Sequence, residues 1–275
     1  MITKEKFATV KSQISTEILK YMANVRDKNQ SHYIMFLSNC RYEPLLENNL
    51  LAKSPYTTDN YKDVFADESR IKFLIDYLKL FYSFPGGEKT SVNEEHATHI
   101  ELMIYTHIWE SRPFLRRLLT LSHLLTDKPY NWNPIIPDYN LSDFITSTIS
   151  KSFKDSGSEL SSIINSGYNQ QLRNAFAHSE YEIDSRMNKL RITLRNFKDK
   201  PNQIPELFID EWKLWFVYSI LFSYLLHYET YHLRRTIIND LGTNIFIIPV
   251  PNKYGATHET FIKYDEDKDR FSFVS

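Results

Sequence analysis

Residues 214–226, LWFVYSILFSYLL, form the longest strongly apolar run of the chain. Its thirteen residues are too few to cross a bilayer as a helix, which takes about 20 apolar residues. The run therefore predicts a helix buried in a protein core, and no membrane partner is expected. It lies within a longer segment of helical spacing, residues 208–240, which Leu241-Gly242 is expected to end.

Glycine is scarce in the chain. Six glycines occur among 275 residues, whereas average usage is about 7%. Only Gly86 and Gly87 are adjacent, so the clustered glycines of dinucleotide-binding and P-loop folds are missing. This pattern argues against those folds, and no cofactor is expected. It favours a mainly α fold, because glycine destabilises a helix interior by about 1 kcal/mol relative to alanine.

Cysteine usage and the N-terminal sequence indicate the cellular compartment, and the net charge indicates how nucleic acid could be bound. Cys40 is the single cysteine of the sequence, so no internal disulfide can form. The N-terminal residues MITKEKFATVK contain no apolar signal segment. Both features predict a cytoplasmic protein. The formal net charge is −1, so binding of nucleic acid would depend on a local basic patch.

Apolar residues recur at three- and four-residue steps in several other segments, which is typical of amphipathic helices. Further helices are predicted over residues 3–27, 31–49, 68–84, 91–125, 141–154 and 159–179. Residues 52–67 are polar and are expected to form a loop. Ser91 begins a capping-box sequence, and Asn140 is placed to cap the helix that follows it. Pro113 is expected to kink one helix, and Gly167 to interrupt another.

Short β segments are also predicted. Alternating apolar and polar residues indicate a strand at 189–195, paired with 181–184 in a hairpin, and C-terminal strands at 245–250, 260–264 and 270–274. Pro85-Gly86-Gly87 is the predicted domain boundary. The expected architecture is an N-terminal helical region (1–88), a helical bundle (89–241) and a C-terminal β appendage (242–275).

Residues 172–178, Leu-Arg-Asn-Ala-Phe-Ala-His, carry the side chains best suited to chemistry. At about 100° per residue, one side of a helix holds a core stripe of Leu172, Ala175, Phe176 and Ser179. The polar side chains on the other arc are those of Arg173, Asn174, His178 and Tyr181. Arg173 and His178 lie roughly 140° apart around the axis, so the arginine must swing to meet the ring.

This Arg-Asn-Ala-Phe-Ala-His sequence, late in an otherwise helical segment, resembles the arginine, polar spacer and histidine signature of the HEPN superfamily (higher eukaryotes and prokaryotes nucleotide-binding domains). The resemblance extends over about residues 90–240. It includes Ile108-Trp109-Glu110 and Tyr130-Asn131-Trp132, which are similar to segments of stand-alone bacterial HEPN proteins. It implies a HEPN-like helical bundle that works as a homodimeric, metal-independent endoribonuclease. Its catalytic residues would be Arg173, Asn174 and His178.

These residue types suit the implied reaction. Attack by a 2′-hydroxyl of RNA on the adjacent phosphate needs a proton acceptor, a proton donor for the leaving 5′-oxygen and a cation beside the transition state. His178 can exchange protons near neutral pH, and Arg173 can hold phosphate oxygens through its forked guanidinium. Two copies in a dimer are expected to share the two proton transfers. The products would be a 2′,3′-cyclic phosphate and a 5′-hydroxyl.

The resemblance also implies a toxin or phage-defence effector that acts on RNA and has an antitoxin or regulatory protein as partner. In one subgroup of the family an antitoxin modifies a tyrosine two residues after the histidine. Here Glu180 occupies that position and Tyr181 follows it, which argues against this form of control. Tyr181 and Glu110 are candidates to support the site, with Glu110 orienting His178 or Arg173. The alternative for Glu110 is a solvated residue or a structural ion pair.

A basic cluster follows the motif and is a candidate RNA-binding surface. Its predicted contact residues are Arg186, Lys189, Arg191 and Arg195. The alternative is an ordinary charged strand face.

His96 and His99 have ligand-like spacing on one helix face, with Glu95 nearby, but no second ligand pair completes a site, so no metal is expected. Two alternatives to a nuclease remain. The bundle would be a non-catalytic interaction or RNA-binding module, or Arg173 and His178 would be ordinary residues at a helix end.

Overall fold

The computed structural model describes residues 2–47, 54–59, 61–84, 94–184, 190–200, 203–252 and 256–274. Its α-helices are α1 (Lys4–Lys28), α2 (Gln30–Leu37), α3 (Tyr61–Phe81), α4 (Glu94–Glu110), α5 (Arg112–His123), α6 (Leu141–Asp143), α7 (Lys151–Asp155), α8 (Leu160–Gly167), α9 (Gln170–Ala177) and α10 (Ile209–Leu241). Its strands are β1 (Arg41–Tyr42), β2 (Tyr56–Thr57), β3 (Tyr181–Asp184), β4 (Arg191–Leu194), β5 (Glu206–Phe208), β6 (Ile245–Pro251), β7 (Thr257–Asp265) and β8 (Arg270–Phe273). A 3-10 turn (Pro44–Leu46) and a π-helical segment (Phe144–Ser150) complete the elements. The fold is mainly α, as predicted.

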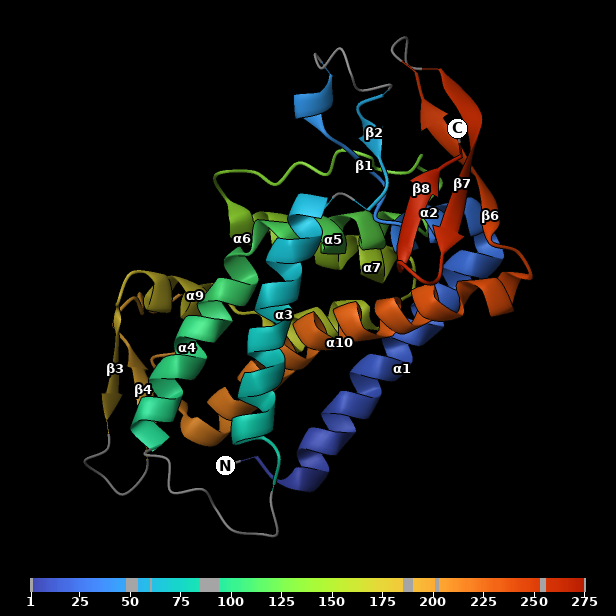
Figure 1. Ribbon diagram of the computed structural model, residues 1–275. Helices are drawn as coiled ribbons and strands as arrows, with labels where there is room; N and C mark the ends of the chain where they lie inside the picture. Colours follow the sequence, from blue (N-terminus) through green and yellow to red (C-terminus); the bar gives the residue numbers. More distant parts are fainter. Residues whose placement is uncertain are drawn as a thin grey trace.

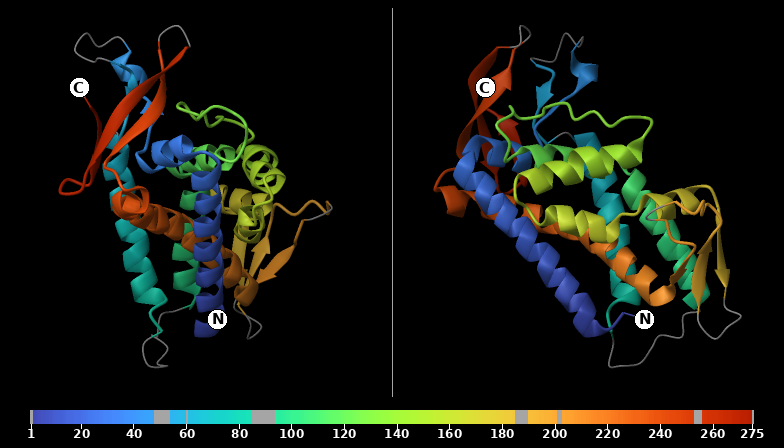
Figure 2. Two further views of the ribbon diagram at one scale, coloured as in Figure 1. Left: turned by 90° about the vertical axis from the view of Figure 1, so that its right-hand side faces the viewer. Right: turned by 180° about the vertical axis from the view of Figure 1, so that it is seen from behind.

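Helix α10 is the element around which the other long helices pack. It contacts α1, α2, α3, α4 and α8, with α3 and α4 in front of it and α1 behind it (Figures 1 and 2). Phe216, Val217 and Ile220 are fully buried, so the apolar run is a core helix, as its length predicted. The helix ends at Gly242, whose φ of 70° is a left-handed conformation that glycine adopts without penalty. Within the described residues, no helix is long and apolar enough to span a bilayer.

Within the described residues, three small antiparallel sheets lie beside the helices. The order β3-β4-β5 confirms the predicted 181–184 hairpin and adds a strand that the sequence did not reveal. The order β6-β7-β8 confirms the predicted C-terminal strands. These two sheets lie near opposite ends of α10 (Figure 1). The pair β1-β2 was not predicted.

Two predictions around residues 31–67 were wrong. The helix expected over 31–49 ends at Leu37, because the chain turns at Asn39, whose φ is 50°, and then enters β1. A loop was expected over 52–67, but residues 61–67 form the first part of α3, which begins at Tyr61. Residues 61–67 contain no glycine or proline, so nothing in their covalent structure opposes a helix despite their polarity.

The helix expected over 91–125 is two helices rather than one kinked helix. Ser111 caps α5 by accepting a hydrogen bond from the Phe114 amide at 3.4 Å, and Pro113 lies in the first turn, where its missing N–H costs nothing. Asn140 makes no side-chain cap and has a φ of 56°, and the helix after it is interrupted by the π-helical segment. Ser91 and Pro85-Gly86-Gly87 lie outside the described residues, so the capping box and the domain boundary stay predictions.

Gly167 separates α8 from α9, as predicted, and it also permits a close helix crossing. A Cβ at this position would lie 3.0 Å from Ser219 Oγ and 3.1 Å from its backbone nitrogen on α10. Ser219 Oγ donates to the Gly167 carbonyl at 2.8 Å and accepts from Trp109 Nε1 at 2.9 Å. This contact ties α4, α8 and α10 together immediately before the helix that carries Arg173.

A buried carboxylate joins three of the long helices. Glu101 of α4 is 1% exposed and accepts hydrogen bonds from Trp212 Nε1 at 3.0 Å and Lys213 Nζ at 2.5 Å, both on α10. Tyr77 of α3 and Tyr82 donate to the same carboxylate at 3.3 and 2.9 Å. Its charge is thus fully compensated within the core, which a buried carboxylate requires.

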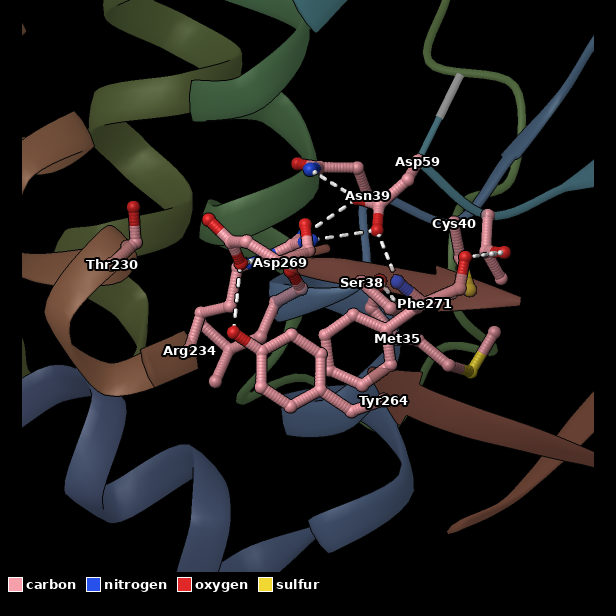
Figure 3. Close-up of polar contacts among 12 residues, drawn as sticks. Met35, Ser38, Asn39, Cys40, Asp59, Thr230, Arg234, Tyr264, Asp269 and Phe271 are labelled. Carbon is pink, nitrogen blue, oxygen red and sulfur yellow. Dashed lines mark hydrogen bonds and ion pairs between the residues drawn. The ribbon is translucent and has the colours of Figure 1, made fainter. Parts of the chain in front are cut away.

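A second buried network, centred on Arg234 of α10, docks the C-terminal sheet (Figure 3). The guanidinium makes a forked pair with Asp59 at 2.6 and 2.8 Å, and its Nε donates to Asp269 at 2.7 Å. Asp59 also accepts from the Phe271 amide of β8 at 2.6 Å. One hydrophobic core likewise includes Ile14, Ile108 and Phe271, so packing continues through all three predicted regions. The division into domains stays a prediction.

Asp269 makes this docking sensitive to acid. Burial acts to raise its pKa, but hydrogen bonds from Arg234 and Tyr264 outweigh burial and hold the pKa below its ordinary value. A carboxyl with a depressed folded-state pKa stabilises the fold above its unfolded value of about 3.9 and loses that contribution as pH falls further. We therefore expect the urea midpoint to fall between pH 5 and pH 3, and to fall less in Asp269→Asn. Equal acid sensitivity of the two proteins would contradict this role.

Candidate functional site

Helix α9 is anchored at its start by two polar contacts. The side chain of Asn169 accepts from the Leu172 amide at 3.0 Å, which caps the helix. The Asn169 amide in turn donates to the hydroxyl of Tyr105 on α4 at 3.0 Å. Leu172 and Ala175 are fully buried and Phe176 is 9% exposed, so the predicted core stripe is confirmed for these three residues.

The end of α9 decides where His178 lies. The helix stops at Ala177, and the Glu180 amide donates to the Ala175 carbonyl at 2.7 Å while the Ser179 amide donates to the Phe176 carbonyl at 3.3 Å. These two bonds define a Schellman motif, with Ser179 at a φ of 56°. Ser179 is therefore exposed and outside the helix, which corrects its place in the predicted core stripe. His178 is the C-cap residue and is exposed.

Arg173 points inward instead of into solvent. Its side chain is 15% exposed, and its Nε lies 3.4 Å from Glu110 Oε1. Its Nη1 donates to the Asn174 side-chain oxygen at 2.8 Å. The Arg173 Nε and the hydroxyl of Tyr168 are buried without a hydrogen-bond partner among the described residues. Thus three of the predicted site residues, Arg173, Asn174 and Glu110, are brought together.

An open pocket of about 560 Å³ lies beside this group, between α4 and the end of α9. The residues that line it are Leu102, Met103, Thr106, His107, Glu110, Ser111, Phe176, Ala177 and Tyr181. Glu110 and Tyr181, both predicted to support the site, therefore share one pocket. The ring of Tyr181 packs edge-on against Phe176, with centroids 5.2 Å apart, and its hydroxyl lies 3.3 Å from His99 Nδ1.

His107 and Ser111 are pocket residues that sequence analysis missed. Burial lowers the pKa of His107, and nearby Arg70 lowers it further while Glu110 opposes the change. The ring is therefore largely neutral at pH 7. Arg70 also donates to Ser111 Oγ. The sequence feature that could have revealed His107 is its position three residues before Glu110, which places both side chains on one face of the helix.

His178 is not joined to the rest of the group within one chain. Among the described residues, none of the hydrogen bonds or ion pairs connects its ring with Arg173, Asn174 or Glu110.

The predicted RNA-binding residues are only partly described. Arg186 and Lys189 lie outside the described residues. Arg191 pairs with Glu206 at 2.9 Å and with Asp184 at 3.6 Å, and Arg195 pairs with Glu182 at 3.0 Å. The carboxylates of these pairs compensate the positive charge of the two arginines, which is typical of a charged strand face.

His96 and His99 belong to no metal cluster in the part of the chain that the structure describes, where no group of three or more possible ligands occurs. Comparisons of the chain with models of protein families, with curated proteins and with solved structures found no match.

Proposed function

We propose that the chain is a HEPN-like, metal-independent endoribonuclease that acts as a homodimer in the cytoplasm, as the toxin or phage-defence effector of a system that includes an antitoxin or regulatory protein. The observation that carries the proposal is the end of α9. The turn after Ala177 presents His178 to solvent, while the same helix holds Arg173 against Glu110 beside an open pocket. An exposed histidine and an arginine held by a carboxylate are the proton carrier and the cation that phosphate transesterification needs.

In the proposed reaction His178 of one copy takes the proton of the 2′-hydroxyl as the O2′–P bond forms. The equivalent histidine of the second copy gives a proton to the 5′-oxygen as the P–O5′ bond breaks. Arg173 stabilises the charge on the phosphate oxygens, and Asn174 and Glu110 hold its guanidinium in place. Among the described residues no hydrogen bond joins His178 to Arg173 within one chain, which supports the sharing of a site between two copies.

Incubation of the purified protein with total RNA in EDTA tests the proposal. We expect cleavage that persists in EDTA and leaves 2′,3′-cyclic phosphate and 5′-hydroxyl ends. A requirement for metal, or 3′-hydroxyl ends, would contradict the mechanism. Light scattering of the same sample should show a dimer, and a stable monomer with full activity would exclude the shared site.

A non-catalytic RNA-binding or interaction module is the second candidate function. The ion pairs of Arg173, Arg191 and Arg195 favour an interaction module over a nuclease, because an arginine held by a carboxylate is less available to phosphate. The same incubation separates the two functions, since a module would leave the RNA uncut, and a native gel would show whether it binds RNA at all.

A further inference from the structure

A second pocket, of about 670 Å³, opens far from the end of α9. It lies where β1 and β2 meet the segment after α5 and the end of β6 (Figure 1). The residues that line it are Tyr42, Tyr56, His123, Lys128, Pro129, Tyr130, Asn131, Trp132, Asn133 and Pro251. Its volume falls within the range of small-molecule sites, about 300–1,000 Å³.

The aromatic walls of this pocket form a continuous chain of edge-to-face contacts. Ring centroids are 5.5 Å apart for Tyr42 and Tyr56, 5.0 Å for Tyr56 and Trp132, and 5.7 Å for Trp132 and Tyr130. The planes of these pairs meet at 61°, 75° and 78°. Trp132 and Tyr130 are 7% and 9% exposed, so the rings open to a planar ligand are those of the half-buried Tyr42 and Tyr56, with Trp132 and Tyr130 as the inner wall.

The backbone and the buried hydroxyl fix this geometry in advance. The Tyr42 amide donates to the Trp132 carbonyl at 2.7 Å. The Tyr130 hydroxyl turns inward and lies 3.1 Å from the Cys40 carbonyl. Tyr42 is held at its hydroxyl by Glu47, and this hydrogen bond is the main cause of the raised pKa of Tyr42. Walls that are already ordered lower the entropic cost of binding.

The polar groups at the rim favour an anion. Lys128 is exposed and makes no ion pair with a carboxylate among the described residues, and none of the lining residues is acidic. Burial and the nearby Lys128 lower the pKa of His123, so the ring is a neutral hydrogen-bonding group at pH 7. Asn131 and Asn133 add amides, which can both donate to and accept from the edge of a base.

We propose that this pocket binds a nucleobase together with its attached phosphate. The base would stack against the aromatic walls, with its edge toward the Asn131 and Asn133 amides, and the phosphate would lie at Lys128. Stacking of a base on an aromatic side chain is tolerant of sequence. The ligand would be either a free mononucleotide or one nucleotide of an RNA strand. Aromatic grooves also hold proline-rich peptides, but such a peptide leaves the cation at the rim without a partner.

Calorimetric titration with nucleoside monophosphates, the matching nucleosides and a short single-stranded RNA tests the assignment. We expect the wild type to bind the monophosphates. Lys128→Glu should weaken their binding by about tenfold, as expected for one charge-assisted contact, and leave nucleoside binding unchanged. Tyr56→Leu should weaken the binding of both the monophosphates and the nucleosides. Lys11→Glu is the matched control, an exposed lysine of α1 remote from the pocket, and should change neither.

The RNA titration distinguishes the sources of the ligand. Equal affinity for RNA and for the monophosphate indicates a free nucleotide, and tighter RNA binding that remains sensitive to Lys128→Glu indicates a strand. Absence of nucleotide and RNA binding to the wild type would overturn the proposal, and so would binding of a proline-rich peptide that is lost in the same variants. If Tyr56→Leu does not fold, the rim variants Lys128→Glu and Asn133→Ala test the proposal instead. It would also be overturned if both variants bound the monophosphates as tightly as the wild type does.

Discussion

His178→Ala is expected to reduce RNA cleavage by about 100- to 10,000-fold, the usual contribution of a general acid–base group. His178 is exposed and caps α9 through its backbone alone, by donating its amide hydrogen to the Asn174 carbonyl. The fold should therefore tolerate the change, and the melting temperature should match that of the wild type. The measurement is the initial rate of cleavage of total RNA in EDTA.

The control for this prediction is His232→Ala, which removes an exposed histidine of α10 and should leave cleavage unchanged. Expression in a bacterial host gives a second readout, since growth arrest should be relieved by His178→Ala and not by His232→Ala. Equal cleavage by His178→Ala and wild type would exclude the nuclease mechanism.

A companion variant separates catalysis from structure at Arg173. Arg173→Lys keeps the positive charge beside Glu110 but loses the guanidinium fork. If Arg173 holds the transition-state phosphate, cleavage falls while RNA binding and the melting temperature stay near those of the wild type. If Arg173 only pairs with Glu110, cleavage is retained.

Asp59→Asn is expected to lower the free energy of unfolding by about 3 kcal/mol, the low end of the cost of breaking a buried ion pair. Arg234 is 8% exposed and would lose its forked carboxylate partner, while Asp269 would still hold its Nε. Asparagine is the chosen replacement because Asp59 has a φ of 45°, which asparagine tolerates better than alanine. Urea denaturation at pH 7 measures the loss.

Asp76→Asn is the matched control for this prediction. Asp76 lies on the surface of α3 and pairs with Lys72 at 3.6 Å, both side chains being more than half exposed. Such a pair contributes little, so the urea midpoint should stay at its wild-type value. A midpoint for Asp59→Asn that also stays there would show that the Arg234 network does not hold the C-terminal sheet in place.

Local periodicity was sufficient to predict the elements whose burial follows a simple pattern. The apolar run of residues 214–226 and the alternation at 191–194 each reflect one face packed in the core. Boundaries were harder to predict where a capping residue outweighs periodicity. Ser111 caps a new helix within the segment that apolar spacing predicted to be one helix. The Schellman turn likewise ends α9 before Ser179.

The candidate site was predictable in part for the same reason. Arg173, Asn174 and Glu110 meet because α9 packs on α4, and the motif already indicated two of them. His107 was missed because its spacing to Glu110 places both residues on one helix face but does not reveal that α9 packs against that helix. The Asp59 contacts with Arg234 and Phe271 join residues far apart in sequence, and no local pattern predicts such a meeting.

The length of α10 has a consequence for the RNA cleavage and nucleotide binding proposed here. Trp212 lies at the α9 end, with its ring centroid 5.2 Å from that of Phe176, and Arg234 lies at the other end beside Asp59, three residues after Tyr56. From Trp212 to Arg234 a helix rises roughly 33 Å at about 1.5 Å per residue. A rigid helix of this length keeps its two ends at a fixed distance from each other. If the aromatic pocket binds a base and His178 cleaves RNA, as proposed, a single nucleotide is too short to span both places, and a strand held at both would be cut at a set distance from the bound base.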